Sequence, residues 1–134
     1  MLLKILVLSA AGMFFFAAVL KADTGNLLPA LKKYLEKAAN EFKDIPDERK
    51  TRLDEISAYL QQKINKNEQI KMIFICTHNS RRSHIAQLWA AAAADYYGIK
   101  QFEAFSGGTE ATAFNPRAVK ALRKAGFSIT VEVE

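Results

Sequence analysis

The stretch that decides the fold is Ile70-Lys71-Met72-Ile73-Phe74-Ile75-Cys76-Thr77-His78-Asn79-Ser80-Arg81-Arg82-Ser83. Residues 70–75 form a mostly apolar run with β-branched and aromatic side chains, which predicts a buried strand. After Ser83, apolar residues recur at helical spacing as far as Gly98, a residue type that commonly ends helices. A strand, a tight loop and a helix N-terminus form an anion site, because unpaired N–H groups and the helix dipole point at the loop.

The loop has the spacing Cys-x5-Arg, from Cys76 to Arg82. Such a loop curls so that successive backbone N–H groups line a concave nest for a tetrahedral oxyanion. We expect Cys76 at the bottom as a thiolate, Arg82 to fork two hydrogen bonds onto the anion, and Ser83 to donate its hydroxyl to the sulfur. The expected oxyanion-binding residues between them are Thr77, His78, Asn79, Ser80 and Arg81. The structural alternative is a buried cysteine at a strand end, followed by two arginines on a solvated helix start.

Two histidines fall in or beside the loop. His78 is a candidate to protonate a leaving oxygen or to tune the thiolate, since imidazole titrates near neutrality. The alternative for His78 is an exposed or loop-bracing residue, and we expect His84 to be a solvated first-turn residue. Two histidines and one cysteine in one element are too few for a structural zinc site, so the sequence predicts neither a metal nor a cofactor.

Residues 76–83 resemble the phosphate loop of the low-molecular-weight protein tyrosine phosphatase superfamily, which includes the thioredoxin-coupled arsenate reductases. The similarity covers roughly residues 70–130. It continues through Ser83-His84-Ile85-Ala86-Gln87-Leu88-Trp89-Ala90 and reappears in Ser106-Gly107-Gly108-Thr109-Glu110 and Asn115-Pro116-Arg117-Ala118-Val119. The loop's residues and the Gly-Thr-Glu segment lean toward the arsenate reductase branch. His78 stands where family members commonly have Gly, and Arg81 where many have a second Cys.

The resemblance implies an α/β fold with a three-layer open parallel sheet, phosphotyrosine phosphatase I-like. It implies that Cys76, Arg82 and Ser83 are catalytic. It also implies that the turn carrying Ser106, Gly107 and Thr109 supports the loop; a glycine turn without a ligand role is the alternative. The expected substrates are a phosphorylated protein or a small oxyanion such as phosphate or arsenate.

Only 58 residues follow Cys76, the one cysteine of the chain. In the family, the phosphatases' Asp-Pro general acid and the reductases' two further cysteines lie much farther along, so we expect a fold that is incomplete at its C-terminal side. Asp95 lies about a dozen helical residues from the loop, more than ~15 Å away and too far to donate a proton. Three functions stay open: a cysteine-dependent phosphatase, which we prefer; an arsenate reductase with an external resolving thiol; and a non-catalytic oxyanion-binding fragment of a longer gene.

Two further segments precede the loop. Residues 1–22 contain Lys4 and an uncharged apolar run from Ile5 to Leu20, which predicts a secretory signal; an uncleaved anchor or a buried helix are the alternatives. We therefore expect an exported protein, periplasmic or extracellular, that touches a membrane only through this segment if it is uncleaved. Residues 23–69 carry two apolar stripes and predict a helical hairpin that covers one sheet face or binds a partner. Residues 70–134 form the partial phosphatase-like domain.

The charge is modest, with a formal net charge of +5 over 134 residues. Residues 70–134 hold eight basic and five acidic side chains, so part of the basic excess lies with the anion loop. This distribution suits an acidic substrate. Without an arginine-aromatic face or a DNA-reading motif, we do not expect nucleic acid binding.

Overall fold

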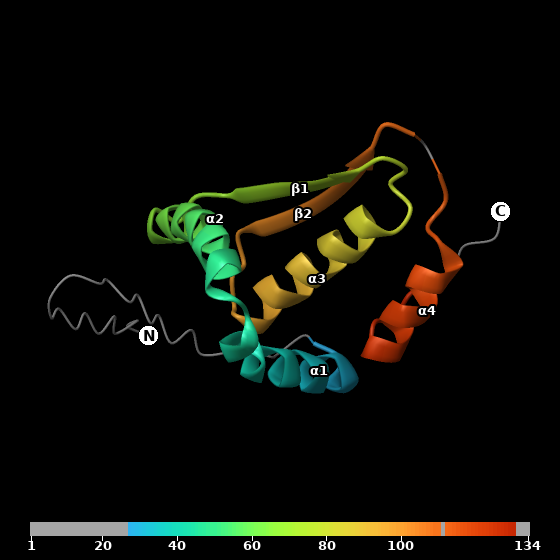
Figure 1. The fold of residues 1–134 in the computed structure, drawn as a ribbon, viewed down its shortest axis with the longest axis horizontal. Coiled ribbons are helices and arrows are strands. Elements are labelled where there is room, and N and C mark those ends of the chain that lie inside the picture. The colour runs from blue at the N-terminus through green and yellow to red at the C-terminus, as the bar shows by residue number, and fades with distance from the viewer. Residues whose placement is uncertain (1–26, 111, 131–134) are drawn as a thin grey trace, which may run out of the picture.

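The computed structural model of the chain describes residues 27–110 and 112–130. In chain order the elements are α1 (Pro29–Asn40), the 3₁₀ helix η1 (Phe42–Asp44), α2 (Asp47–Asn65), β1 (Ile70–Cys76), α3 (Arg82–Tyr96), β2 (Phe102–Gly108) and α4 (Pro116–Ala125), as Figure 1 shows. The expected signal or anchor in residues 1–22 lies outside the described residues, and export stays a prediction. Within the described ranges, no helix is both long and apolar enough to cross a membrane.

The sheet consists of β1 and β2, which pair in parallel from Ile70 opposite Phe102 to Cys76 opposite Gly108. Helix α3 connects the two strands and packs against both. The predicted mixed α/β class with a parallel sheet is therefore confirmed. Because parallel strands end at the same edge, the loop after Cys76 and the segment after Gly108 meet there, where ligands bind in open parallel sheets.

The two faces of the sheet have different surroundings. Ile70 is fully buried, and Met72 and Phe74 on the same side face α3. On the opposite side, Ile73 and Ile75 are 61% and 68% exposed. Among residues 27–110 and 112–130 the helices lie on one side of the sheet, so only one of the two helical layers expected of the fold class is seen (Figure 1).

The apolar core lies between α1, α3 and α4. Leu31 and Leu35 of α1 are buried with Ala92 of α3, and Trp89 stacks on Tyr34 with ring centroids 4.9 Å apart. Helix α4 ends at Gly126, whose φ of 109° favours glycine, and a Cβ there would lie 2.5 Å from the backbone N of Leu31. Only a glycine permits this close approach of the end of α4 to the start of α1.

Two helices precede the sheet, as the stripes predicted, but they contribute unequally. Helix α1 contacts α3 and α4, whereas α2 contacts β1. Leu60 and Ile64 of α2 line an apolar groove of about 400 Å³ with β1 and α3. Ile56 and Tyr59 recur with these two residues at helical spacing, yet their side chains are about half exposed. The apolar stripe of α2 is thus only partly used in packing.

Two boundaries differ from those the sequence predicted. Ser106, Gly107 and Gly108 were expected in a loop, but they continue β2 because pairing with β1 extends to the level of Cys76. Tertiary pairing here overrides the low strand preference of glycine. The alternation of apolar and polar residues in Ile129-Thr130-Val131-Glu132-Val133 predicts a strand, but residues 127–130 are irregular and residues 131–133 lie outside the described part.

Candidate active site

The 76–83 loop joins the last residue of β1 to the first turn of α3. Cys76 ends the strand and Arg82 opens the helix. Asn79 has a φ of 42°, the left-handed conformation that asparagine tolerates better than most residues. The resulting curl directs the backbone N–H groups of Asn79, Ser80 and Ser83 at the sulfur of Cys76. The loop thus curls around the Cys76 sulfur, and the binding of an oxyanion within it stays a prediction.

Three side chains at the base of the loop form a short polar chain. The Cys76 Sγ lies 3.2 Å from the Ser83 Oγ, which lies 2.7 Å from the Asn79 Oδ1. Ser83 is only 2% exposed. A hydroxyl has a single proton, so Ser83 donates either to Asn79 or to the sulfur. The structure records the Ser83 hydroxyl donating to the Asn79 Oδ1; donation to a thiolate instead would require the Asn79 amide to present its NH₂ to the hydroxyl oxygen.

These contacts lower the pKa of Cys76 from its ordinary 9.0 to about 6. The hydrogen bond from the Ser83 hydroxyl is the largest cause, followed by the Ser83 N–H; the N–H groups of Ser80 and Asn79 add smaller contributions, and desolvation of the sulfur opposes the shift. At neutral pH the thiolate, the reactive form of cysteine, therefore predominates.

Above the sulfur the loop encloses a hollow of about 310 Å³. Its lining residues are Cys76, His78, Ser80, Arg81, Arg82, Thr112 and Asn115. The two arginines are exposed to solvent and, with the N-terminus of α3, make the hollow electropositive. Thr77 and Asn79 are outside this lining: Thr77 accepts hydrogen bonds through its carbonyl, and Asn79 shapes the loop from below.

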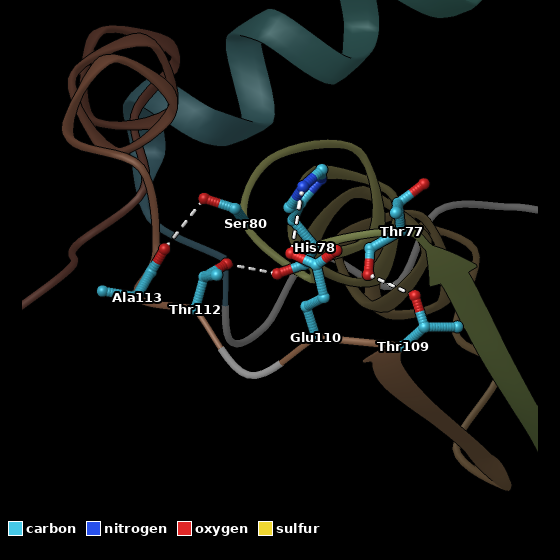
Figure 2. A network of polar contacts seen from close by, with 7 residues as sticks. All are labelled: Thr77, His78, Ser80, Thr109, Glu110, Thr112 and Ala113. Atoms are coloured by element: carbon cyan, nitrogen blue, oxygen red, sulfur yellow. Dashed lines mark hydrogen bonds and ion pairs between the residues drawn. The ribbon is translucent and has the colours of Figure 1, made fainter.

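One flank of the loop is held by residues 109, 110 and 112–115, which we call the strap. Near β2, the Thr77 carbonyl accepts hydrogen bonds from the Thr109 N–H at 2.9 Å, the Thr109 hydroxyl at 3.0 Å and the Glu110 N–H at 3.1 Å. Figure 2 shows the strap running beneath the loop, with the side chains of Thr109 and Glu110 lying between the strap and the loop. This part of the strap fixes the first residue after the nucleophile.

Nearer α4, the strap holds the middle of the loop. The Thr112 hydroxyl donates to the His78 carbonyl, and the Ser80 hydroxyl donates to the Ala113 carbonyl at 2.9 Å (Figure 2). The Asn115 N–H donates to the Ser80 carbonyl at 2.9 Å, while its side chain caps α4 by accepting the Arg117 N–H at 3.0 Å. Asparagine followed by proline is a typical start of a helix, and here Asn115 both caps α4 and ties the loop to it.

His78 and Glu110 form an ion pair across the loop and the strap. The His78 Nε2 lies 3.1 Å from the Glu110 Oε2, and both side chains are a little more than half exposed. A side chain in place of the Gly that is common at this position in the resembling family is expected to narrow the loop or crowd its mouth. In the structure it lies beside the hollow and turns toward Glu110 (Figure 2).

The three residues expected to support the loop have different positions. Thr109 contacts the loop directly, as described above. Ser106 lies 3.2 Å from the Nδ1 of His84 and so supports the first turn of α3 rather than the loop. Gly107 faces the other side of the sheet, where a Cβ would meet only the Ile73 side chain at 3.4 Å or more and that of Ile75 at 4.0 Å.

Gly108 is the site residue that the sequence analysis missed. A Cβ at this position would lie 2.6 Å from the Asn79 N and 2.7 Å from the Cys76 carbonyl, so the loop can close against β2 only over a glycine. The doublet Gly107-Gly108 at the end of an apolar run was the available signal. The prediction that His84 is a solvated residue is wrong, because its ring stacks on Phe114 with centroids 4.4 Å apart.

Within residues 27–110 and 112–130, no three side chains of the types His, Cys, Asp and Glu gather as a metal site would require. What the site offers chemically is a cysteine with a lowered pKa beneath an electropositive hollow. That combination serves nucleophilic attack on a tetrahedral oxyanion.

Comparison with known proteins gives both a family and named relatives. Residues 71–133 match the family described as low molecular weight phosphotyrosine protein phosphatase. An arsenate reductase of Bacillus subtilis (strain 168) is 42% identical over 57 residues, which cover 42% of this chain and 38% of the relative. An arsenate reductase of Bacillus licheniformis is 44% identical over 57 residues, which again cover 42% of this chain and 38% of the relative. "Arsenate reductase 2" of Staphylococcus haemolyticus is 37% identical over 57 residues, which cover 42% of this chain and 40% of the relative.

The aligned part of the chain thus spans about two fifths of the length of these relatives. No solved structure matches the chain.

Proposed function

We propose that this chain is a cysteine-dependent phosphatase. The predicted resemblance to the low-molecular-weight phosphatase and arsenate reductase superfamily is confirmed over residues 71–133 and supports the proposal. Its nucleophile is Cys76, and its substrate class is the aryl phosphate monoester. One observation carries the proposal: the Cys76 Sγ sits 3.2 Å from the Ser83 hydroxyl, under backbone N–H groups, at the base of an electropositive hollow.

In the first step the Cys76 thiolate attacks phosphorus. The S–P bond forms as the P–O ester bond breaks, and the bonding electron pair leaves with the ester oxygen. Arg82 and the loop N–H groups hold the non-bridging oxygens, whose charge is concentrated in the transition state. In the second step water attacks the cysteinyl-phosphate, and the thiolate leaves. A thiol with a lowered pKa is the better leaving group, so the Ser83 contact serves both steps.

Arsenate reduction is the second candidate, and the relatives' names favour it. Cys76 would attack arsenic(V) with loss of water, and a second thiol would then attack the sulfur of the adduct. Arsenic would leave as arsenite, reduced by two electrons, while the two thiols are oxidised to a disulfide. Cys76 is the only cysteine of the 134 residues, so this chain would need an external thiol, from a small molecule or a second protein. The export proposed from residues 1–22 weakens this candidate, because reducing partners are scarcer outside the cytosol.

The test is to assay the full chain for two reactions: phosphate release from 4-nitrophenyl phosphate, and arsenate-dependent oxidation of added glutathione or thioredoxin. Phosphate release that is absent in Cys76→Ser and strongly reduced in Arg82→Lys supports the phosphatase, since lysine lacks the forked pair of donors. Thiol oxidation that requires arsenate and Cys76 supports the reductase instead. Neither reaction, combined with phosphate protection of Cys76 from alkylation, would overturn both and leave a non-catalytic oxyanion-binding site.

A further inference from the structure

The hollow above Cys76 is lined by two neighbouring guanidinium groups, and the proposed reaction uses one of them. Arg82 has the Cys-x5-Arg spacing from the nucleophile and holds the phosphate that is transferred. Arg81 lines the same hollow, and its side chain is exposed to solvent. Arg81 also stands where many members of the resembling family have a second cysteine. The second guanidinium is therefore a feature of this chain that the transfer of a single phosphate does not explain.

The backbone position of Arg81 does not require an arginine. Arg81 is the N-cap of α3, and its carbonyl accepts the Ile85 N–H at 2.9 Å. Its side chain makes no capping hydrogen bond, because a guanidinium has no acceptor atom. The first turn of α3 contains no acidic residue. A cation at this end of a helix is electrostatically unfavourable, and an anion bound beside it removes that cost.

The side chain of Arg81 is not neutralised by a neighbouring carboxylate. Among residues 27–110 and 112–130, neither Arg81 nor Arg82 forms an ion pair. Glu110 of the strap has its carboxylate 3.1 Å from the Nε2 of His78 and is thus already paired. The guanidinium of Arg81 is therefore available to an anion that enters the hollow from solvent.

The strap side of the hollow adds one neutral donor. The hydroxyls of Ser80 and Thr112 line the hollow but donate to backbone carbonyls of the strap and the loop. Asn115 also lines it, and its Oδ1 accepts the Arg117 N–H at 3.0 Å. The amide NH₂ of Asn115 is therefore the group that it can offer to a ligand. Among the described residues, no carboxylate is part of this lining, so the hollow as a whole favours anions.

We propose that Arg81 forms a second anion subsite beside the reacting phosphate, with the NH₂ of Asn115 as a neutral donor in the same hollow. The inference rests on the proposed phosphatase function and narrows its substrate class. The substrates are aryl phosphates that carry a second anionic group, a carboxylate or a phosphate, near the phosphate that Cys76 attacks. Arg82 holds the phosphate that is transferred and Arg81 holds the second group, since the planar fork of a guanidinium matches both kinds of anion.

The test measures binding to the full chain without turnover. Three probes are compared at constant ionic strength by the concentration that halves the rate of Cys76 alkylation by iodoacetamide. Methylphosphonate has one anionic group, whereas phosphonoacetate and methylenediphosphonate have two. The probes with two anionic groups are expected to protect Cys76 at concentrations about tenfold lower than methylphosphonate does. Phosphonoacetate and methylenediphosphonate differ in the second group, so their comparison distinguishes a carboxylate from a phosphate.

Arg81→Gln is expected to raise the half-protecting concentration of the two-anion probes about tenfold, and that of methylphosphonate less than about threefold. Arg81→Lys keeps the charge but not the fork, so its values should be intermediate. Arg117→Gln is the matched control. It removes the same charge from the first turn of α4, outside the lining of the hollow, and should change all three values less than about twofold.

Phosphate release from 4-nitrophenyl phosphate is measured in parallel, so that the two proposals can fail separately. If the three probes protect the unaltered chain equally, or if Arg81→Gln acts on them no differently from Arg117→Gln, the inference is overturned, and a chain that still releases phosphate remains a phosphatase. If the probes protect as expected but no phosphate is released, the phosphatase proposal is overturned, and the subsite stands as an anion-binding site.

Discussion

The edge of the sheet where both strands end at their carboxyl termini, and the face of the sheet turned away from α3, which we call the outer face, are built in opposite ways. At the edge, the carbonyls of Thr77, His78 and Ser80 all accept hydrogen bonds from the strap, and Ser83 is buried in a polar chain with the nucleophile. On the outer face of the same strands, Ile73 and Ile75 are exposed. The difference shows that the shape of the site is set by polar contacts within residues 76–115. Substitutions at the edge should therefore change Cys76 chemistry, and substitutions on the outer face should not.

The largest effect is expected at Gly108, where the two regions meet. Gly108→Ala would place a Cβ 2.6 Å from the Asn79 N, so the loop must shift. We expect a loss of stability of about 1–3 kcal/mol and a slower reaction of Cys76 with iodoacetamide at pH 7. Both are measured by urea denaturation and timed alkylation.

Gly107→Ala is the matched control for this prediction. It adds the same methyl group one residue earlier, on the outer face, where the nearest atom is the end of the exposed Ile73 side chain at 3.4 Å. Its stability should change by less than about 0.5 kcal/mol. Equal losses in the two variants would show that the edge is no more constrained than the outer face.

The next effect is expected at Ser83, whose hydroxyl is the largest cause of the lowered pKa of Cys76. Ser83→Ala removes that hydrogen bond, so the pKa of Cys76 should rise toward its ordinary value. The alkylation rate at pH 7 should fall about three- to tenfold. Ser80→Ala keeps the backbone N–H near the sulfur and loses only the hydroxyl bond to the strap. A Ser80→Ala variant that shifts the pKa as far as Ser83→Ala does would contradict this assignment.

The lowered pKa also predicts how stability changes with pH. A thiol whose pKa falls from 9.0 to about 6 on folding adds stability that is fully present above pH 9 and is lost as pH falls through about 6. The free energy of unfolding of the parent, relative to that of Cys76→Ser, should therefore rise between pH 6 and pH 9. A constant difference across that range, measured by urea denaturation, would show that the thiolate is not stabilised in the folded chain.

The smallest effect is expected on the outer face. Ile75 directly precedes the nucleophile, yet its side chain is 68% exposed and points away from α3. Ile75→Thr should leave the alkylation rate of Cys76 within about twofold and the stability within about 0.5 kcal/mol. A large change in Cys76 reactivity would mean that the edge and the outer face are not independent.

Much of the site could be predicted because it is local in sequence. β1, the loop and the start of α3 lie within 14 consecutive residues, and their apolar run, spacing and helix periodicity indicate the nest directly. The contact of the Ser83 hydroxyl with the sulfur followed from residue chemistry.

The other parts depend on pairing between distant residues. Gly108 matters only because β2 pairs with β1 up to Cys76, and His84 is covered only because Phe114 returns over it. The ion pair of His78 with Glu110 joins residues on the two sides of an entire helix and strand. No pattern within one segment reveals such contacts. Helix α2 is the opposite case: its apolar stripe is clear in the sequence, but only part of that stripe is buried in the structure.

The most direct test of the central claim is the pH dependence of Cys76 alkylation in the full chain, with and without inorganic phosphate. If the 76–83 loop forms an oxyanion nest around a thiolate, the rate should rise with a midpoint near pH 6, and phosphate should slow it. Phosphate protection should weaken in Arg82→Lys, since lysine cannot make the forked contact. A midpoint near 9, with no protection by phosphate, would contradict the account.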